Sequence, residues 1–216
     1  MKKTIILATL LSSQFTQADV FLGGDVEINY FDNKTIVDDV EAHSEASLFG
    51  SLSFEHMIPL VPNVRFSFGN ADSDLISYGK NDITAYYEIF DNDLLSFDIG
   101  VGATQIHSGE VLMTYNQDVS STTVEFEGVI PHAYVGLELG IPSTPLTLYS
   151  DLLATAYKDS KLIDGSVGIR YDVSLALVEV GVQAGYKVLE FNMDDFDSLN
   201  YNVKNDGWFL GVNFDF

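Results

Sequence analysis

The chain has 216 residues, of which 32 are acidic, 10 are basic and none is cysteine. A net charge of −22 argues against nucleic-acid binding, because such binding requires Lys and Arg to neutralise phosphates. Without cysteine there are no disulfide bonds, so an exported chain of this kind must gain its stability from a core or from closed strand pairing.

The first residues have the pattern of a secretory signal peptide. Two lysines precede the apolar run 5–11, and small and polar residues then lead to Ala18. The run is shorter than the roughly 20 residues that a helix needs to cross a bilayer. We expect cleavage between Ala18 and Asp19, which divides the chain into a signal peptide, 1–18, and one mature domain, 19–216. Loss of the two lysines leaves 8 basic residues against 32 acidic ones, a net charge of −24.

Ten segments of the mature domain alternate between apolar and polar residues, which is the two-residue period of a β-strand. Most exceed the five or six residues usual in globular strands and reach the roughly 9–11 that a tilted strand needs to cross a membrane. In chain order they are Val20–Phe31, Ala46–His56, Asn63–Asn70, Asp82–Phe90, Leu94–Gln105, Glu125–Leu139, Leu146–Tyr157, Leu162–Asp172, Leu177–Leu189 and Asp206–Phe216.

The connections between these segments alternate in length. Those after the even-numbered segments are short, and those after the odd-numbered segments are mostly longer, with Lys158–Lys161 as the exception. The longer ones are Asp32–Glu45, Ala71–Asn81, Ile106–Val124 and Glu190–Asn205. Short periplasmic turns and longer extracellular loops are typical of transmembrane barrels. We therefore predict an all-β fold, a closed antiparallel up-and-down transmembrane β-barrel of about ten strands, with eight as the alternative.

A soluble barrel would place the apolar face inside, and a membrane barrel places it against lipid. The polar face consists mostly of small residues, which suit a narrow lumen, and the mature chain is poor in lysine. These small residues are Gly23, Ser47, Ser51, Ser53, Ser67, Gly69, Gly100, Gly102, Gly136, Gly168, Gly181, Gly185 and Gly211. Aromatic residues of the apolar face also fall at two levels, as in the girdles of membrane barrels. They are Tyr30, Phe68, Tyr186 and Trp208 at one level and Phe54, Phe97, Tyr171, Phe214 and Phe216 at the other.

The chain ends with large apolar residues at alternate positions, namely Trp208, Leu210, Val212, Phe214 and Phe216. This pattern resembles the C-terminal signature of Gram-negative outer-membrane proteins, which the barrel assembly machinery reads. The resemblance implies an outer-membrane location. It also implies transient binding to that machinery and to periplasmic chaperones, and lasting contact with outer-membrane lipids and lipopolysaccharide. We expect a monomer.

The mature N-terminus contains Gly23 and Gly24 within the run Val20–Asp25. With the missing cysteines, the final Phe216 and the turn Ile58–Asn63, it resembles an uncharacterised family of small barrels named for a Gly-Gly motif. That family brings no known catalytic residues to this chain.

Many acidic residues fall on the lumen-facing positions, with few basic residues opposite them. The acids are Asp25, Glu27, Glu55, Glu88, Asp98, Glu138, Asp151, Asp164, Asp172 and Glu179, and the basic residues are Arg65, Arg170 and Lys187. Enclosed carboxylates are costly unless they are paired or solvated. We therefore expect ion pairs of Arg65, Arg170 and Lys187 with acids that include Glu55, Glu88, Asp98, Asp151 and Asp172, together with trapped water.

Three functions remain open. The first is a structural or surface-interaction barrel with a plugged lumen, and the second is a narrow channel in which rings of acids attract cations. The third is a rim hydrolase resembling the omptin proteases, for which His107 and Glu110 have the right residue types. The loops are too short for the tall mouth of omptins, so we predict no enzyme and no cofactor.

The acidic segment Asp194–Asp197 invites comparison with calcium sites, which use several carboxylate oxygens. It lacks the glycine and the distal glutamate of an EF-hand loop, so a solvated loop without a metal site is expected. Divalent ions could still bridge such loop acids to lipopolysaccharide phosphates. Loop mobility and thermal stability that are insensitive to a chelator would argue against this.

Overall fold

The computed structural model describes residues 22–216 except 93, 116–119, 158–159 and 176–177. The expected signal peptide, with its cleavage position at Ala18 and Asp19, lies outside the described residues. No helix within the described ranges is long and apolar enough to cross a membrane.

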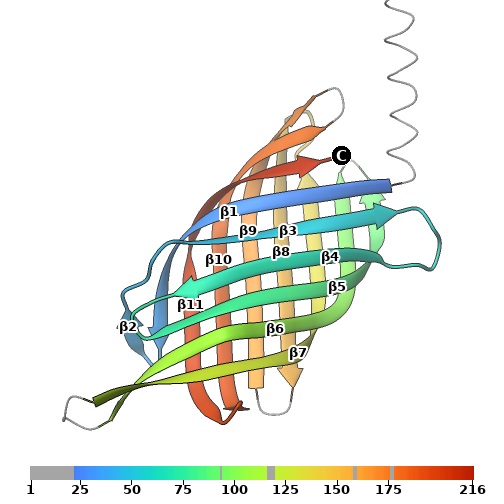
Figure 1. Ribbon diagram of the computed structural model, residues 1–216. Helices are drawn as coiled ribbons and strands as arrows, with labels where there is room; N and C mark the ends of the chain where they lie inside the picture. The colour runs from blue at the N-terminus through green and yellow to red at the C-terminus, as the bar shows by residue number, and fades with distance from the viewer. Residues whose placement is uncertain (1–21, 93, 116–119, 158–159, 176–177) are drawn as a thin grey trace, which may run out of the picture.

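The described residues form one antiparallel sheet in which ten strands follow one another around a ring (Figure 1). The last strand pairs with the first from Asp215–Asp25 to Val203–Val37, which closes the sheet into a barrel. One further short strand, β2, pairs with β1 alone. The predicted closed ten-stranded barrel is therefore confirmed. The strands are β1 (Leu22–Val37), β2 (Val40–Ala42), β3 (Ser47–His56), β4 (Asn63–Asp72), β5 (Ile76–Asn92), β6 (Leu95–Tyr115), β7 (Ser120–Gly140), β8 (Leu146–Tyr157), β9 (Ser160–Ser174), β10 (Glu179–Phe196) and β11 (Leu199–Asp215).

The two ends of the barrel differ. At the terminal end, where β1 begins and β11 ends, short turns join the strands. At the opposite, distal end, the long hairpins β6–β7 and β10–β11 project farther (Figure 1). The predicted long loops are wrong here, because most of their residues continue the strands: β6 extends to Tyr115 and β10 to Phe196.

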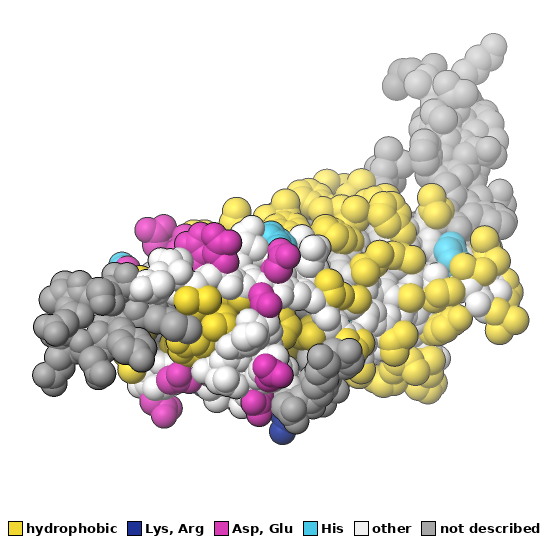
Figure 2. Space-filling model, turned by 60° about the horizontal axis from the view of Figure 1, so that its bottom comes forward, with side chains coloured by type: hydrophobic (Ala, Val, Ile, Leu, Met, Phe, Trp, Pro, Cys, Tyr) yellow, Lys and Arg dark blue, Asp and Glu magenta, His cyan; other side chains and the backbone are white. Residues whose placement is uncertain are grey.

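The outer surface of the terminal half is apolar. Exposed large hydrophobic side chains alternate with inward small or polar ones along each strand, and on the face shown in Figure 2 they cover the half next to the terminal end. Examples from around the ring are Ile28, Phe66, Ile83, Val101, Val135, Leu152, Ile169, Val182 and Leu210. We call this surface the apolar belt. At its distal edge Trp208 is 69% exposed and meets the Tyr186 ring edge-on, with ring centroids 5.1 Å apart.

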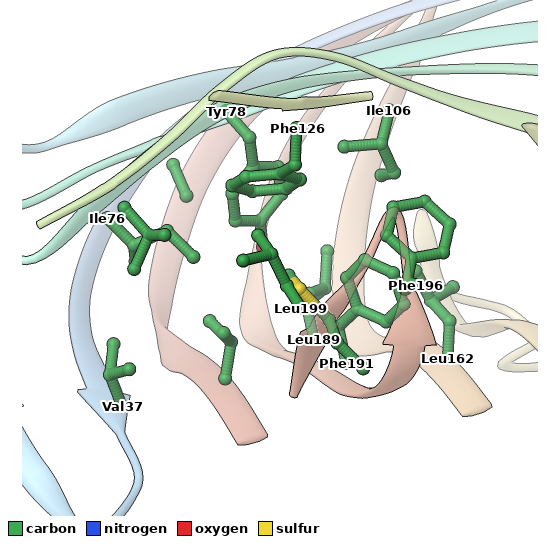
Figure 3. Close-up of a cluster of buried hydrophobic side chains, with 14 of the residues drawn as sticks. Val37, Ile76, Tyr78, Ile106, Phe126, Leu162, Leu189, Phe191, Phe196 and Leu199 are labelled. Atoms are coloured by element: carbon green, nitrogen blue, oxygen red, sulfur yellow. The ribbon is translucent and has the colours of Figure 1, made fainter. Parts of the chain in front are cut away.

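The distal half has the opposite arrangement, with its apolar side chains inside (Figure 3). On β10 the apolar residues change from even positions, such as Val182, to odd positions, such as Phe191 and Met193. This switch of phase explains why the sequence pattern seemed to end at Leu189. We call the inward group the distal core; its members are Val37, Ala71, Ile76, Tyr78, Ile106, Val111, Phe126, Ile130, Leu153, Leu162, Leu189, Phe191, Met193, Phe196, Leu199 and Val203.

The apolar belt can be tested at Val212, which faces outward between Leu210 and Phe214 on β11. Val212→Arg should lower the free energy of unfolding in bilayers by about 2–4 kcal/mol, because the charge would enter the hydrocarbon. Asn202→Arg, on the same strand but beyond the belt, is the matched control and should change it little. Equal stability of the two variants in reversible urea titrations would contradict the placement of the belt.

Candidate functional site: the charged lumen

The lumen of the terminal half holds charged and aromatic side chains in a narrow space. Glycines on the inward face leave room for them. A Cβ atom on Gly168 would lie 2.7 Å from the ring of Tyr149, and one on Gly181 would lie 2.6 Å from Arg170. The ring of Tyr149 is thus accommodated because Gly168, its direct partner on the neighbouring strand, has no side chain.

Arg65 crosses the lumen. It lies on β4, and its Nη1 is 3.5 Å from Oδ1 of Asp151 on β8, a strand far from β4 around the ring. The guanidinium also donates to the Tyr134 hydroxyl at 3.3 Å, and that hydroxyl donates to Asp151 at 2.7 Å. These three side chains form a partition across the barrel, which we call the septum.

Arg170 forms a second cluster beside the septum. Its two terminal nitrogens donate to both oxygens of Glu138 at 3.1 and 2.9 Å, and its Nε donates to Asp172 at 2.8 Å. The hydroxyl of Thr147 completes the cluster by donating to Asp172 at 2.9 Å. A bidentate pair of this kind orients both partners, because the planar guanidinium matches the carboxylate geometry.

A third cluster lies closer to the distal core and contains two lysines. Asp164 on β9 accepts from Lys187 and from Lys80, whose Nζ is 3.0 Å from the second carboxylate oxygen. Lys80 also pairs with Asp82. Sequence reasoning missed Lys80, which fell within a predicted loop. The signal was there, since Ile76, Tyr78, Lys80, Asp82 and Thr84 alternate as one inward face of β5.

His132 joins this lysine cluster through hydroxyl groups. Thr104 donates to Asp82 at 2.7 Å and lies 2.9 Å from Nδ1 of His132, while Thr84 lies 2.9 Å from Nε2. Both ring nitrogens are therefore occupied by threonine hydroxyls inside the barrel. Nothing in the sequence distinguished His132 from the other histidines before the register of β5, β6 and β7 was known.

The acids on the terminal side of the septum lack such partners. Glu55 accepts from the Tyr86 hydroxyl at 2.8 Å, but neither it nor Glu88 or Asp98 has a basic group within 4.0 Å among the described residues. The three lie instead around a cavity of about 160 Å³, which we call the vestibule. The structure therefore places Arg65, Arg170, Lys187, Asp151 and Asp172 in ion pairs and leaves these three acids outside them.

A smaller cavity of about 80 Å³ lies between the septum and the distal core. Phe31 and Phe49 line it together with the lysine cluster. Three polar atoms at its walls are buried without a hydrogen-bond partner among the described residues: the hydroxyl oxygens of Tyr78 and Ser51 and the side-chain carbonyl oxygen of Asn205. The volume matches about two or three waters at about 30 Å³ each, which suits these unpaired groups.

The start of β1 meets the last residue of the chain where the barrel closes. Phe216 and Gly24 exchange backbone hydrogen bonds of 2.8 and 3.0 Å, and a Cβ on Gly24 would lie 2.9 Å from the Phe216 ring. Gly24, the second glycine of the Gly-Gly motif, therefore makes room for the final aromatic ring at the position where the barrel closes. The other residues of the C-terminal pattern, Trp208, Leu210, Val212 and Phe214, point outward into the belt.

The rim candidates His107 and Glu110 lie on the distal part of β6. The ring of His107 lies against Gly79, and its Nδ1 is 3.4 Å from the Ser108 hydroxyl, with no ion pair to a described carboxylate. Within the acidic segment, Asp197 accepts from the backbone of Glu127 at 3.1 Å. The described part of the chain contains no group of three or more His, Asp or Glu side chains suited to holding a metal ion.

A closed antiparallel ring with an apolar outer belt and a charged interior defines the class of membrane-type β-barrels. No protein-family model matches the chain, and no curated protein matches it in sequence.

Among solved structures, the chain is similar to Ail of Yersinia pestis, with a TM-score of 0.40, 14% identity and coverage of 91% of this chain and 99% of that one. It is also similar to the translocator domain of the autotransporter NalP from Neisseria meningitidis, with a TM-score of 0.44, 11% identity and coverage of 99% and 97%. A third similar structure is the outer-membrane protease OmpT from Escherichia coli, with a TM-score of 0.42, 9% identity and coverage of 90% of this chain and 96% of that one.

The lysine cluster makes a prediction about stability. Lys80→Met would leave Asp82 and Asp164 short of a cation inside the barrel, so unfolding should become easier by about 3–5 kcal/mol. The control is Lys204→Met, because Lys204 is half exposed and its contact with Asp206 at 3.4 Å is worth less than about 1 kcal/mol. Denaturant titrations of both variants in the same micelles would measure the free energy of unfolding. An unchanged value for Lys80→Met would show that the lysine cluster does not stabilise the barrel.

Proposed function

We propose that this chain is an outer-membrane β-barrel protein of a Gram-negative bacterium, with a closed lumen and a structural or surface-interaction role. The apolar belt supports the membrane location, because exposed hydrophobic side chains around a whole ring need an apolar surrounding. The C-terminal pattern of outward aromatic residues that ends at Phe216 supports the outer membrane. Membership of the Gly-Gly-motif family stays a prediction.

The observation that carries the closed lumen is the distal core. Its side chains come from strands all around the ring and meet inside the distal half, where Ile106, Leu162 and Phe191 have no exposed surface (Figure 3). An ion that passes must also cross the septum, where Arg65 is held by Asp151 and Tyr134. Neither barrier can open without breaking packed contacts or buried ion pairs.

The surface role is supported by the distal half, which lies beyond the belt. Its outer face carries acidic side chains, seen at the left of Figure 2, on strands that the distal core holds together. With the short turns facing the periplasm, this rigid acidic part projects from the cell. Its partners in the proposal are lipopolysaccharide and the divalent cations that lie between lipopolysaccharide phosphates and carboxylates.

The alternative function is a cation-preferring channel, and the acidic vestibule favours it. Single-channel recording in planar bilayers separates the two functions. We expect no conductance steps above background for the wild-type chain, because the distal core fills the lumen. Phe191→Ala combined with Phe196→Ala should increase the ion conductance of the barrel. The two rings pack edge-on inside the distal core with centroids 4.9 Å apart, and their removal opens space there.

Cation-selective steps in the wild-type protein would contradict the closed lumen. A reduction of those steps by Glu55→Gln would then establish the channel function, because Glu55 lines the vestibule and Gln keeps its shape.

Calcium bridging makes a separate prediction. In membranes with lipopolysaccharide, a chelator should lower the melting temperature of the wild-type barrel and should have little effect on Asp194→Asn combined with Asp195→Asn. The physical reason is that a divalent ion offsets repulsion between carboxylates and phosphates only while both remain charged. The same chelator response in phosphatidylcholine vesicles would contradict a lipopolysaccharide bridge.

We propose that the chain is not a hydrolase. The support is geometric: His107 faces Gly79 and Ser108, and among the described residues it forms no ion pair with a carboxylate that would orient it as a general base. Turnover of a fluorogenic peptide or lipid that is abolished by His107→Ala would overturn this.

A further inference from the structure

The vestibule carries far more negative than positive charge. It opens at the terminal end, where Glu88, Asp91 and Asp215 are exposed. Nine acidic side chains and two arginines line it: Asp25, Glu27, Glu55, Glu88, Asp91, Asp98, Glu138, Asp151 and Asp215, with Arg65 and Arg170. A concave acidic surface with low-dielectric walls concentrates cations from solution.

Both arginines of the vestibule are already engaged. Arg65 is paired with Asp151, and Arg170 is paired with Glu138 and with Asp172, which lies outside the lining. The other seven lining acids have no basic group within 4.0 Å among the described residues. Seven lining carboxyl groups are therefore left without a cationic partner inside the described part of the barrel.

Two unused hydrogen-bonding atoms line the same cavity. Tyr149 is only 5% exposed, and its hydroxyl has no partner among the described residues. Oδ1 of Asp98 is likewise buried and unpaired. A buried hydroxyl and a buried carboxylate oxygen without partners are costly unless a ligand or water completes them.

The arrangement of the acids does not suit a single metal ion. No three of the described carboxylates converge as a metal site would require, because those of the vestibule are distributed around its wall. Between them stand the rings of Tyr86, Tyr134 and Tyr149. Two of these rings already accept a cation, because Arg65 lies 5.6 Å from the Tyr134 centroid and Arg170 lies 5.9 Å from the Tyr149 centroid. Aromatic rings among dispersed carboxylates favour organic ammonium groups, which bind through cation–π contacts and through their methylene surfaces.

We propose that the vestibule is a binding site for a linear polyamine, whose ammonium groups pair with separate carboxylates while its methylene chain lies against the tyrosine rings. Glu55 and Asp98 supply charge on the β3 and β6 sides, and the Tyr149 hydroxyl accepts a hydrogen bond from an ammonium group. The site is independent of whether the barrel conducts, because binding requires only access from the terminal end.

Isothermal titration calorimetry of the full barrel in zwitterionic micelles at low ionic strength tests this, with spermidine as the probe. We expect one saturable event. Glu55→Gln combined with Asp98→Asn should weaken the affinity by about tenfold or more, because two ion pairs are lost. Tyr149→Phe should weaken it by about threefold without any change in charge, which a merely electrostatic attraction would not do.

The matched control is Asp38→Asn combined with Asp39→Asn, which removes the same charge from the distal end and should leave the affinity unchanged. Heat-modifiable migration on gels verifies that every variant is folded. Absence of saturable binding to the wild-type barrel would overturn the proposal, as would equal losses in both double variants. Tighter binding of magnesium alone, lost in the Glu55 and Asp98 variant, would replace the polyamine site with a metal site.

Discussion

Closure of the strand ring between β1 and β11 is the constraint on which the rest of the structure depends. In hydrocarbon, an unpaired backbone amide or carbonyl costs several kcal/mol, so a sheet can cross a membrane only if its two edges pair. The seam meets this condition from Asp25–Asp215 onward, and the terminal contact of Phe216 with Gly24 extends it to the last residue. Once the ring is closed, every inward side chain is confined to a narrow interior. That confinement sets which residues must be small and which charges must pair.

The two halves of the barrel have side-chain arrangements that suit different surroundings, lipid for the terminal half and water for the distal half. In the terminal half the apolar side chains point outward and the interior is polar, and in the distal half this order is reversed. The change occurs within single strands, as on β10 between Val182 and Phe191. The level at which the alternation changes phase therefore marks where lipid gives way to water around the barrel. The same change brings apolar side chains into the distal half of the barrel, and the proposed closed lumen rests on this packing.

Much of the fold could be predicted from sequence, because alternation reports directly on strands with one apolar face. The segment Leu146–Tyr157 was predicted with both of its ends, and the alternating segments predicted a closed barrel of about ten strands, with eight as the alternative. The distal extensions were missed because the phase switch near Leu189 resembles the end of a pattern. The partners of the lumen charges were beyond sequence reasoning. Arg65 meets Asp151 only because curvature brings β4 near β8, and Lys80 meets Asp164 in the same way.

The outward orientation of the apolar belt is the central claim, and the chain offers a direct probe of it. Trp208 is the single tryptophan of the sequence and lies exposed at the distal edge of the belt. Its fluorescence can be measured in vesicles made with phospholipids brominated at defined depths along the acyl chain. We predict blue-shifted emission that is quenched most by bromines near the headgroup and only weakly by aqueous acrylamide. Emission quenched by acrylamide and unaffected by the brominated lipids would contradict the account.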